Sequence, residues 1–595
     1  MPRQTPPHAR TSAHPTAVRG TGTTPKSTPK PTPKPTPGRR TADRRTAVLR
    51  SRLRKTRSLL PRASDYASAH RTWKGDVLAG ITVGIVALPL ALAFAVSSGM
   101  PPEAGLVTSV VAGFVAAVFG GSPVQVSGAS GAMVVVLAPI TAEHGVGAVP
   151  VVAVMAGTLV VCAGFLRLGR YVAFIPWPVI EGFTFGVAAV ILLQQVPDAL
   201  WVEETTRSNP ALAAFESFSL VDVPEVAWAL GTAGLVAAIM VLAPLLHPSL
   251  PGSIIGIVVV TVAAGVLGAP LVPIGDLPAS LPAPSFPHVD LGTLGALLGP
   301  ACAVATLASI ESLLSARVAS RLSDAAPYHG DRELVGQGLA SVASGFFSGM
   351  PTTGAFARTA VNVRAGARSR ISAIVHALVL LVIVYVCASI VSHVPVAALA
   401  GVLLVTAVRM VSPSTVRAVV TASRGEAWVF VLTALVTISV DIVVAVLFGV
   451  LLAAILALRS LSRLSWTSRV PLPGEPVDGD ERIALYRIDG VLFFGAGDRI
   501  LGEIGRAGGI SVVVVRLGDL GLLDSSGARV IAELVTSLEK QDITVLVEGI
   551  QVRHRQVAHC AGVIASLRHR KHVFTDLDAA IEHARDHVAR ERVAA

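Results

Sequence analysis

A long succession of apolar segments most constrains what this chain can fold into. Roughly fourteen such segments lie between Val77 and about Leu461, and many are long enough to cross a bilayer as α-helices. Only 15% of the 595 residues are charged and the mean hydropathy is +0.66, which excludes a soluble protein of this length. The sequence therefore predicts a polytopic α-helical membrane protein with about 14 transmembrane spans. The approximate cores of the segments are 77–97, 104–120, 127–140, 148–166, 176–197, 226–246, 253–268, 293–318, 335–349, 353–364, 371–393, 396–411, 426–441 and 442–461.

The placement of Lys and Arg between the segments predicts the orientation of the chain, because cytoplasmic loops are enriched in these residues. With the basic N-terminus in the cytoplasm, the inward loops contain Arg167, Arg170, Arg321, Arg332, Arg364, Arg368, Arg370, Arg417 and Arg424. The outward loops contain almost none, and Arg207 is the exception. An even number of spans returns the C-terminus to the same side. We therefore expect a multi-pass protein of the cell (plasma or inner) membrane with both termini in the cytoplasm.

The basic character of the chain is confined to its N-terminal part. Residues 1–46 are rich in Pro, Thr, Lys and Arg and are expected to be a disordered tail. Residues 47–75 form a basic juxtamembrane segment, either a helix on an anionic inner leaflet or a solvated linker. Residues 1–75 contain 18 Lys and Arg against Asp43 and Asp65, a net charge of +16, so −5 remains for the rest out of the total of +11. The charge therefore does not indicate a nucleic-acid partner.

The character of the sequence changes after the last apolar segment. We expect a transmembrane domain over residues 76–464, a linker over 465–482 and a soluble α/β domain over 483–590. Alternating strands and helices of ordinary length favour that last assignment. The predicted strands are Ala484–Ile488, Ser511–Leu517 and Ile543–Val547, and the predicted helices are Leu501–Arg506, Ser526–Leu538, Val552–Ala561 and Leu577–Val588.

Two polar, Gly-rich stretches interrupt the apolar region. One is Ser348–Asn362 and the other is Gly121–Ala132, which precedes a short apolar run over Met133–Ile140. Broken backbone at membrane depth must be buried in protein or line a cavity. Interrupted segments in corresponding halves of a chain point to the binding site of an inverted-repeat transporter. A helix beginning near Gly354 would direct its N–H groups and its positive dipole end into that cavity, with Arg358 one turn further on, as anion binding requires.

Glu311 is an acidic residue within an apolar segment, where such residues are costly and usually functional. Ser315 lies four positions later on the same helix face. The pair could carry a coupled proton on the carboxylate or ligate Na⁺, and the structural alternative is that Glu311 neutralises Arg358. His376, also in an apolar segment, is interpreted as a hydrogen-bonded histidine of the helix bundle.

Other residues limit the chemistry of the chain. Asp524 and Ser525 open a predicted helix, so either can cap it, and an exposed Ser at a helix N-terminus is also a possible phosphate acceptor. The four cysteines are widely scattered, which predicts neither a disulfide framework nor a metal site. No segment shows a nucleophile–base pair or a nucleotide loop, so we expect no enzymatic activity and no cofactor.

With these motifs in view, the sequence resembles the SulP family of sulfate permeases (solute-carrier family 26), with a C-terminal domain similar to a STAS domain. The resemblance covers roughly residues 73–590 and rests on Gly121–Ala132, Ile310–Arg317, Glu333–Leu339, Arg358–Asn362 and Asp524–Gly527. It implies a seven-plus-seven inverted repeat with core and gate domains that move in an elevator-like cycle. It also implies a homodimer.

By matching positions, the resemblance places the anion at the starts of the third and tenth spans, against Ser130, Gly131, Ala132, Gly354, Ala355 and Phe356. Arg358 matches a basic position near the anion in some relatives. Glu311 and Ser315 match the acid and hydroxyl that bind Na⁺ in sodium-coupled members; these are Asp and Thr there, and the change favours proton coupling. Ser525 matches the serine that is phosphorylated in soluble STAS proteins.

The expected function is secondary active transport of a small inorganic oxyanion, bicarbonate or sulfate, coupled to H⁺ or Na⁺ and regulated by the STAS domain. The expected partners are the anion, the lipid bilayer and a second copy of the chain. Dicarboxylate transport and an uncoupled anion channel or exchanger remain open as alternatives, as does a sensor that does not transport.

Overall fold

The computed structural model describes residues 59–66, 69–200, 202, 209–219, 223–247, 250–278, 280–286, 291–323, 325–440, 442–463, 466–492 and 509–594. The predicted tail over residues 1–46, Arg207 and the predicted helix Leu501–Arg506 lie outside these residues, as does most of the juxtamembrane segment.

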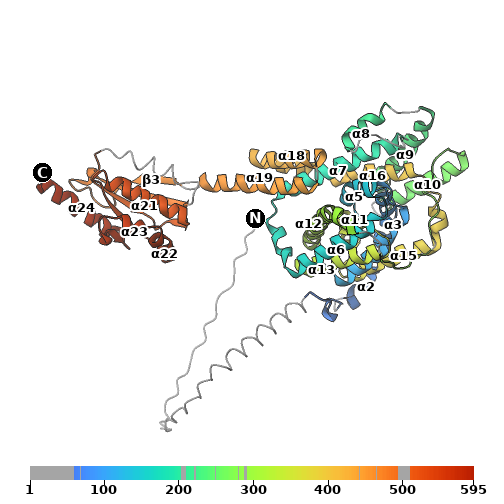
Figure 1. Ribbon diagram of the computed structural model, residues 1–595, viewed down its shortest axis with the longest axis horizontal. Coiled ribbons are helices and arrows are strands. Elements are labelled where there is room, and N and C mark those ends of the chain that lie inside the picture. Colours follow the sequence, from blue (N-terminus) through green and yellow to red (C-terminus); the bar gives the residue numbers. More distant parts are fainter. Residues whose placement is uncertain are drawn as a thin grey trace, which may run out of the picture. The chain divides into compact units, whose positions relative to one another are not determined.

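Helices dominate the apolar region (Figure 1). They are α2 (Ala69–Ser97), α3 (Pro102–Val107), α4 (Gly113–Phe119), α5 (Gly131–His144), α6 (Ala148–Phe165), α7 (Trp177–Ala199), α8 (Pro210–Ser217), α9 (Val223–Leu246), α10 (Gly252–Leu267), α11 (Leu291–Ala296), α12 (Leu298–Leu322), α13 (Gly330–Phe346), α14 (Phe356–Arg364), α15 (Ile371–Val391), α16 (Val396–Met410), α17 (Pro413–Ala422), α18 (Arg424–Ser439) and α19 (Ile442–Arg463). A π-helical turn, η2 (Thr108–Ala112), joins α3 to α4, and 3-10 turns lie at η1 (Ala63–Tyr66) and η3 (Leu168–Phe174).

Eight helices among the described residues are long and apolar enough to cross a membrane, and three shorter helices are also apolar. The eight are Ala69–Ser97, Pro102–Phe119, Ala148–Phe165, Trp177–Pro197, Val226–Leu246, Leu298–Leu322, Ile371–Val391 and Val396–Ala422, and the shorter ones are Gly131–His144, Gly252–Leu267 and Val444–Ser460. Every apolar segment predicted from the sequence overlaps at least one helix. The polytopic helical architecture therefore agrees with the prediction, and the full number of spans stays a prediction.

Helices α6 and α13 approach each other closely through glycines. A Cβ atom at Gly157 would lie 2.6 Å from the carbonyl oxygen of Gly338, and one at Gly338 would lie 2.5 Å from the carbonyl oxygen of Gly157. Seven residues further along α13, a Cβ at Gly345 would lie 2.6 Å from the carbonyl oxygen of Pro150. Because small residues let helix backbones meet inside a membrane, these glycines fix α13 against α6.

The C-terminal α/β domain is built on a six-stranded sheet of β3 (Trp466–Val470), β4 (Ile483–Leu492), β5 (Val512–Arg516), β6 (Leu520–Leu523), β7 (Thr544–Glu548) and β8 (Val573–Phe574). The order is β3-β4-β5-β7-β8, and β6 pairs with the end of β4. Only β3 runs antiparallel to its neighbour. The sequence missed β3, which lies within the range predicted to be a linker, as well as β6 and β8.

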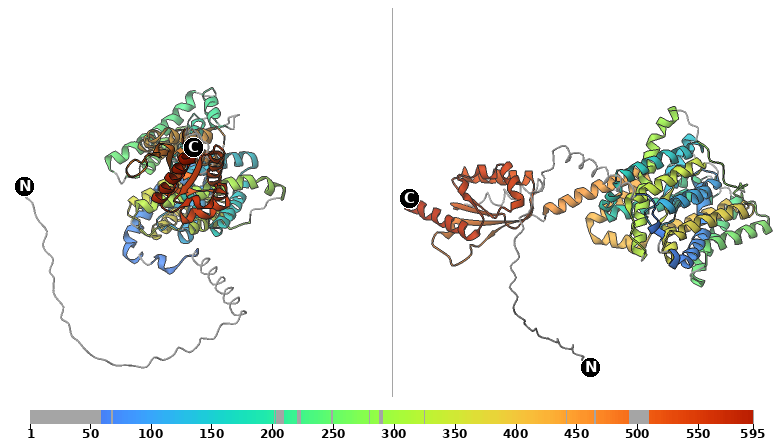
Figure 2. Two further views of the ribbon diagram at one scale, coloured as in Figure 1. Left: turned by 90° about the vertical axis from the view of Figure 1, so that its left-hand side faces the viewer. Right: turned by 90° about the horizontal axis from the view of Figure 1, so that it is seen from below.

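Helices cover both faces of this sheet (Figure 2). They are α21 (Ser525–Glu539), α22 (Val552–Cys560), α23 (Val563–Ser566) and α24 (Leu577–Ala594), with 3-10 turns at η4 (Asp480–Arg482) and η5 (Arg570–His572). Alternate residues of β5 face opposite sides, as a pleated strand requires: Val513 and Val515 join the core under α21, whereas Val512 and Val514 join the core under α24. The domain therefore has two hydrophobic cores of its own.

Candidate functional site

The two Gly-rich stretches predicted from the sequence meet in a short antiparallel ladder. Strand β1 (Ser127–Gly128) pairs with strand β2 (Thr353–Gly354), with Ser127 opposite Gly354 and Gly128 opposite Thr353. The backbone N–H of Ala355 extends the ladder by donating to the carbonyl of Val126 at 2.9 Å. All of these residues are buried, so the broken backbone lies inside protein, as expected at membrane depth.

Each strand leads directly into a helix whose first turn lacks a side-chain cap. Helix α5 follows Ser130 and helix α14 follows Ala355, and neither of these residues hydrogen-bonds a backbone N–H of its helix through its side chain. The first N–H groups of a helix have no partner within the helix. The pairing of β1 with β2 therefore brings two sets of free donors and two positive dipole ends into one region.

Ser130 hydrogen-bonds a carboxylate instead of capping α5. Its Oγ donates to Oε2 of Glu311 in α12 at 2.9 Å. A serine at this position ordinarily accepts a hydrogen bond from the second or third N–H of the helix. The geometry therefore keeps the α5 donors available while fixing the Glu311 side chain beside the start of that helix.

Helix α12 holds both halves of the ladder through polar groups adjacent to Glu311. The backbone N–H of Gly354 donates to Oγ of Ser312 at 3.0 Å, and Nε2 of Gln125 donates to the Ser312 carbonyl at 3.2 Å. Ser315, one turn beyond Glu311, donates from Oγ to Oγ1 of Thr359 at 3.4 Å. Ser315 therefore lies on the α14 side of the site and bonds Thr359 rather than Glu311.

Arg358 is a buried cation that supports the ladder from behind. Only 2% of the residue is exposed. Its Nη2 donates to the carbonyl of Ala129, the residue before Ser130, and its Nη1 has no hydrogen-bond partner among the described residues. Gly128 has φ +156 and a Cβ there would lie 2.8 Å from Nη1, so only glycine admits the guanidinium at this point.

The structure brings the predicted site residues together but gives them different environments. Ser130, Gly131, Ala132, Gly354, Ala355 and Arg358 are all buried. Phe356, the first residue of α14, is 51% exposed. The Phe356 side chain is therefore the one exposed side chain of this group. The other residues are buried, and Gly131, Ala132, Gly354 and Ala355 offer mainly backbone groups to the site.

Two buried residues that support the site escaped the sequence reasoning. In α13, Glu333 accepts hydrogen bonds from the backbone N–H groups of Gly121 (2.7 Å) and Ser122 (2.9 Å), and from Nε2 of Gln337 (2.8 Å). Nε2 of Gln337 also donates to Oγ of Ser127 in β1 at 2.6 Å. Glu333 lies in the charged first turn of α13, before the apolar segment predicted at 335–349, so it lacked the signal that marked Glu311.

Asp76, at the start of α2, was also missed. It is fully buried, and Oδ1 accepts from the backbone N–H groups of Arg368 (2.7 Å) and Ser369 (2.9 Å) just before α15. Its Oδ2 accepts from the hydroxyls of Ser369 and Thr72, both at 2.6 Å. Asp76 thereby joins the first helix of one half of the chain to a helix of the other.

The interpretation of His376 as a hydrogen-bonded histidine is wrong. The residue is fully buried in α15, and neither ring nitrogen has a hydrogen-bond partner among the residues that the structure describes. It packs near Gly113, where an added Cβ would lie 3.9 Å from the His376 ring. Unpaired ring nitrogens have no signature in the sequence.

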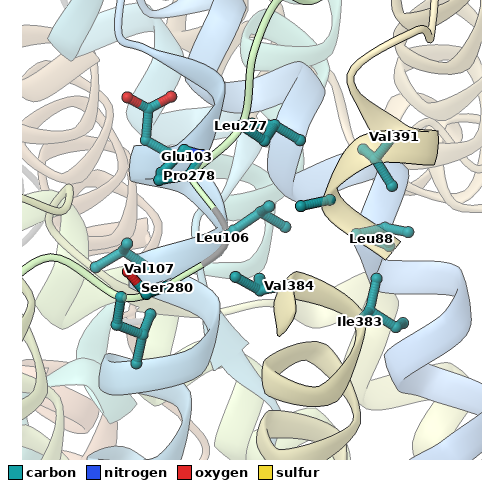
Figure 3. Close-up of a pocket in the computed structure, with 12 residues that line it drawn as sticks. Leu88, Glu103, Leu106, Val107, Leu277, Pro278, Ser280, Ile383, Val384 and Val391 are labelled. Carbon is teal, nitrogen blue, oxygen red and sulfur yellow. The ribbon is translucent and has the colours of Figure 1, made fainter. Parts of the chain in front are cut away.

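The pocket in Figure 3 is distinct from this site. It is lined mainly by aliphatic side chains of α2, α3, α15 and residues 277, 278, 280 and 281, and the Glu103 carboxylate points away from them. None of the residues predicted to bind the anion contributes to it.

Asp524 and Ser525 were both candidates to cap the helix of the α/β domain, and Asp524 does so. Oδ1 of Asp524 accepts from the backbone N–H of Gly527 at 2.7 Å, at the start of α21. Ser525 is exposed at the rim of a groove along α21 and α22. The hydroxyl is therefore open to solvent, and its phosphorylation remains a prediction.

Charged groups tie the two ends of this domain together. Nε and Nη2 of Arg585 in α24 donate to Asp480 at 2.9 and 2.8 Å. These hydrogen bonds lower the pKa of Asp480 below its ordinary value of 3.8. Burial raises the pKa of Glu548 above 4.5, against the opposing effect of Arg516. The Asp480 pair connects the C-terminal helix to the entrance of the sheet.

Known families and proteins match most of the chain. The family model for the sulfate permease family matches residues 73–433, and the model for the STAS domain matches residues 476–580. YvdB of Bacillus subtilis (strain 168), a candidate sulfate transporter, is 31% identical over 84% of this chain and 96% of its own length. The bicarbonate transporter BicA of Picosynechococcus sp. (strain ATCC 27264 / PCC 7002 / PR-6) is 31% identical over 76% of this chain and 84% of its own.

A solved structure extends the likeness to both parts of the fold. The overall structure of SLC26A9 covers 91% of this chain and 95% of its own, with a TM-score of 0.77 and 16% identity. That identity shows the fold alone. The structural likeness and the family models together establish the helical membrane domain and the α/β STAS domain. The chain therefore belongs to the sulfate permease (SulP) family, whose members are membrane transporters.

Proposed function

We propose that this protein is a secondary active transporter of a small inorganic oxyanion, bicarbonate or sulfate. The observation that carries the proposal is the meeting of two uncapped helix starts, α5 and α14, across the β1–β2 ladder. Free N–H groups and helix dipoles bind oxyanions without a cage of cations. The names of YvdB and BicA support sulfate and bicarbonate as the two substrates to test first.

In this proposal the anion binds against the N–H groups of Gly131 and Ala132 on one side and of Ala357 and Phe356 on the other. The exposed ring of Phe356 borders this space. Arg358 holds the Ala129 carbonyl through Nη2, next to Ser130, and its Nη1 has no partner among the described residues, so its guanidinium is placed to attract the anion. Its positive charge acts through the protein, where the low dielectric lets charges interact over longer distances than in water.

Charge balance gives Glu311 the coupling role. With Glu311 ionised, its charge and that of Arg358 cancel, and an incoming anion would leave the buried site negative. A proton on Glu311 leaves the site with one positive charge, which a monoanion then neutralises. Binding of the anion and of a proton therefore favour each other. The Ser315 hydroxyl is bonded to Thr359 rather than to Glu311, which supports H⁺ over Na⁺ as the coupling ion.

The hydrogen bonds among α12, β1 and β2 support an elevator-like cycle. Gly354, Gln125 and Ser130 each bond to α12, so these elements would move together as a core against the remaining helices. We further propose that both termini are cytoplasmic, that the protein forms a homodimer in the cell membrane, and that the STAS domain regulates transport. It performs no enzymatic reaction.

The test is uptake of labelled bicarbonate and sulfate by purified protein in liposomes, with an imposed H⁺ gradient, an imposed Na⁺ gradient or neither. We expect the wild type to concentrate one of the two anions when the H⁺ gradient is present. Glu311→Gln should lose this concentrative uptake. Glu181→Gln serves as the matched control, because Glu181 lies within an apolar helix, α7, but is not part of the site, and it should retain uptake.

Each other result has a defined meaning. Flux that needs no gradient and survives in Glu311→Gln would establish a channel or exchanger. Uptake driven only by Na⁺ would keep the transporter and overturn proton coupling. Absence of flux for both anions, with uptake of a dicarboxylate, would replace the substrate class.

A further inference from the structure

Three histidines of the STAS domain converge at one point, where His572 is buried and His583 and His587 are half-buried. His572 ends the turn η5, and His583 and His587 lie one turn apart on α24. One ligand nitrogen from each of the three lies within 4.8 Å of the others. The ring centroid of His572 lies 5.5 Å from that of His583 and 5.7 Å from that of His587. The centroids of His583 and His587 are 5.5 Å apart.

Two buried nitrogens of this cluster lack a hydrogen-bond partner among the described residues. His572 is only 2% exposed, and its Nδ1 has no hydrogen-bond partner among the described residues. Nε2 of His583 is also buried without a partner in that part of the chain. A buried polar atom that lacks a partner costs about 1–3 kcal/mol, so two such atoms within one cluster of histidines call for a ligand.

We propose that His572, His583 and His587 form a binding site for a divalent transition-metal ion in the STAS domain. Imidazole suits Zn²⁺, Cu²⁺, Ni²⁺ and Fe²⁺, and two histidines four positions apart on a helix present their rings to the same side. Three histidines leave a fourth tetrahedral position open for water or another ligand. No sulfate, bicarbonate or other anion of the transport site is involved.

The rings require only a modest adjustment to bind the ion. Zn–N bonds of about 2.0–2.1 Å in a tetrahedron place the nitrogens about 3.3 Å apart, so the present separation of up to 4.8 Å must close by about 1.5 Å. His569 lies next to the group, with its ring centroid 5.6 Å from that of His572. His569 is exposed, so its ring can move towards the open fourth coordination position of the metal ion.

Nearby charges do not prevent a cation from binding. On the η5 side, Arg568 is already paired with Glu539 at 3.0 Å and Asp542 at 3.5 Å. On α24, Glu591 is paired with Arg482 at 2.9 Å. A bound ion would connect η5 to α24, and through these ion pairs it would hold the C-terminal helix against the start of β4.

The test uses the full-length protein purified in detergent through an affinity tag without histidines and stripped with a chelator. Zinc is then added, and bound metal is measured by mass spectrometry after desalting and by calorimetry. We expect one Zn²⁺ per wild-type chain. His583→Gln and His587→Gln should each weaken binding more than about 100-fold, because even loss of a residue that only orients a ligand costs about 10- to 100-fold.

His559→Gln is the matched control, since His559 is an exposed STAS histidine on α22 away from the cluster, and it should bind zinc like the wild type. X-ray absorption of zinc-loaded wild type gives a second readout that needs no variant. We expect scattering from three imidazoles. Equal zinc binding by His583→Gln and wild type, or a wild-type spectrum without imidazole scattering, overturns the proposal.

Discussion

Replacing Glu333 by leucine should loosen the segment that leads into β1. Leucine has a similar volume but accepts no hydrogen bond, so the buried N–H groups of Gly121 and Ser122 lose their 2.7 and 2.9 Å partner. Each unsatisfied buried donor costs about 1–3 kcal/mol, which gives about 2–6 kcal/mol for the two. Gln337 keeps its bond to Ser127 and adds little to this cost.

Hydrogen exchange measured by mass spectrometry on the full-length protein reads out this loss directly. At about 1.4 kcal/mol per factor of ten, protection of the amides over residues 119–128 should fall about 30-fold or more in Glu333→Leu. Glu333→Gln retains one carbonyl oxygen as an acceptor and should fall much less. Strand β5 should exchange equally in all three proteins. Unchanged protection of 119–128 in the leucine variant would refute the assignment of Glu333 as the acceptor that holds this segment.

Two further predictions concern helix packing and the STAS domain. Gly338→Ala should lower the Tm in detergent, because its Cβ would lie 2.5 Å from the Gly157 carbonyl oxygen and overpacking costs about 1–3 kcal/mol. Gly231→Ala is the control, since a Cβ there meets nothing within 4 Å, and it should leave the Tm unchanged or raise it. Asp480→Asn should destabilise a fragment of residues 466–595 in urea by about 0.5–1 kcal/mol at pH 7, through loss of the Arg585 ion pair. The pKa of Asp480 is lowered in the folded state, so the pair stabilises the domain above pH 3.8 and ceases to do so as the pH falls further; the difference between wild type and variant should therefore vanish at low pH.

Hydrophobic pattern carried most of the fold prediction. Apolar stretches of sufficient length predict membrane helices. Strands β5 and β7 were visible as runs rich in valine, and β4 as a short apolar stretch. Strand β3 was not, because Trp466–Val470 is largely polar and its strand state depends on pairing with β4. Such tertiary pairing leaves no periodicity in five residues of sequence.

The site was predictable in outline but not in its contacts. The Gly-rich composition of the two stretches and the acid at Glu311 pointed to the elements that the structure brings together. The bond from Ser130 to Glu311 joins residues 181 positions apart, and nothing local specifies it. The histidine cluster was overlooked for the opposite reason. The scattered cysteines predicted no metal site, but the four-residue spacing of His583 and His587 on one helix face is a local signal for one.

The pairing of β1 with β2 also has a consequence for biosynthesis. The N–H of Val126 bonds the side chain of a residue 233 positions later. A ribosome adding about 5–20 residues per second needs about 12–47 s to synthesise that interval. During this time the polar backbone before α5 has no strand to pair with and cannot rest in lipid. The segment before α5 must therefore stay in contact with water or other protein until the second half of the chain has been synthesised.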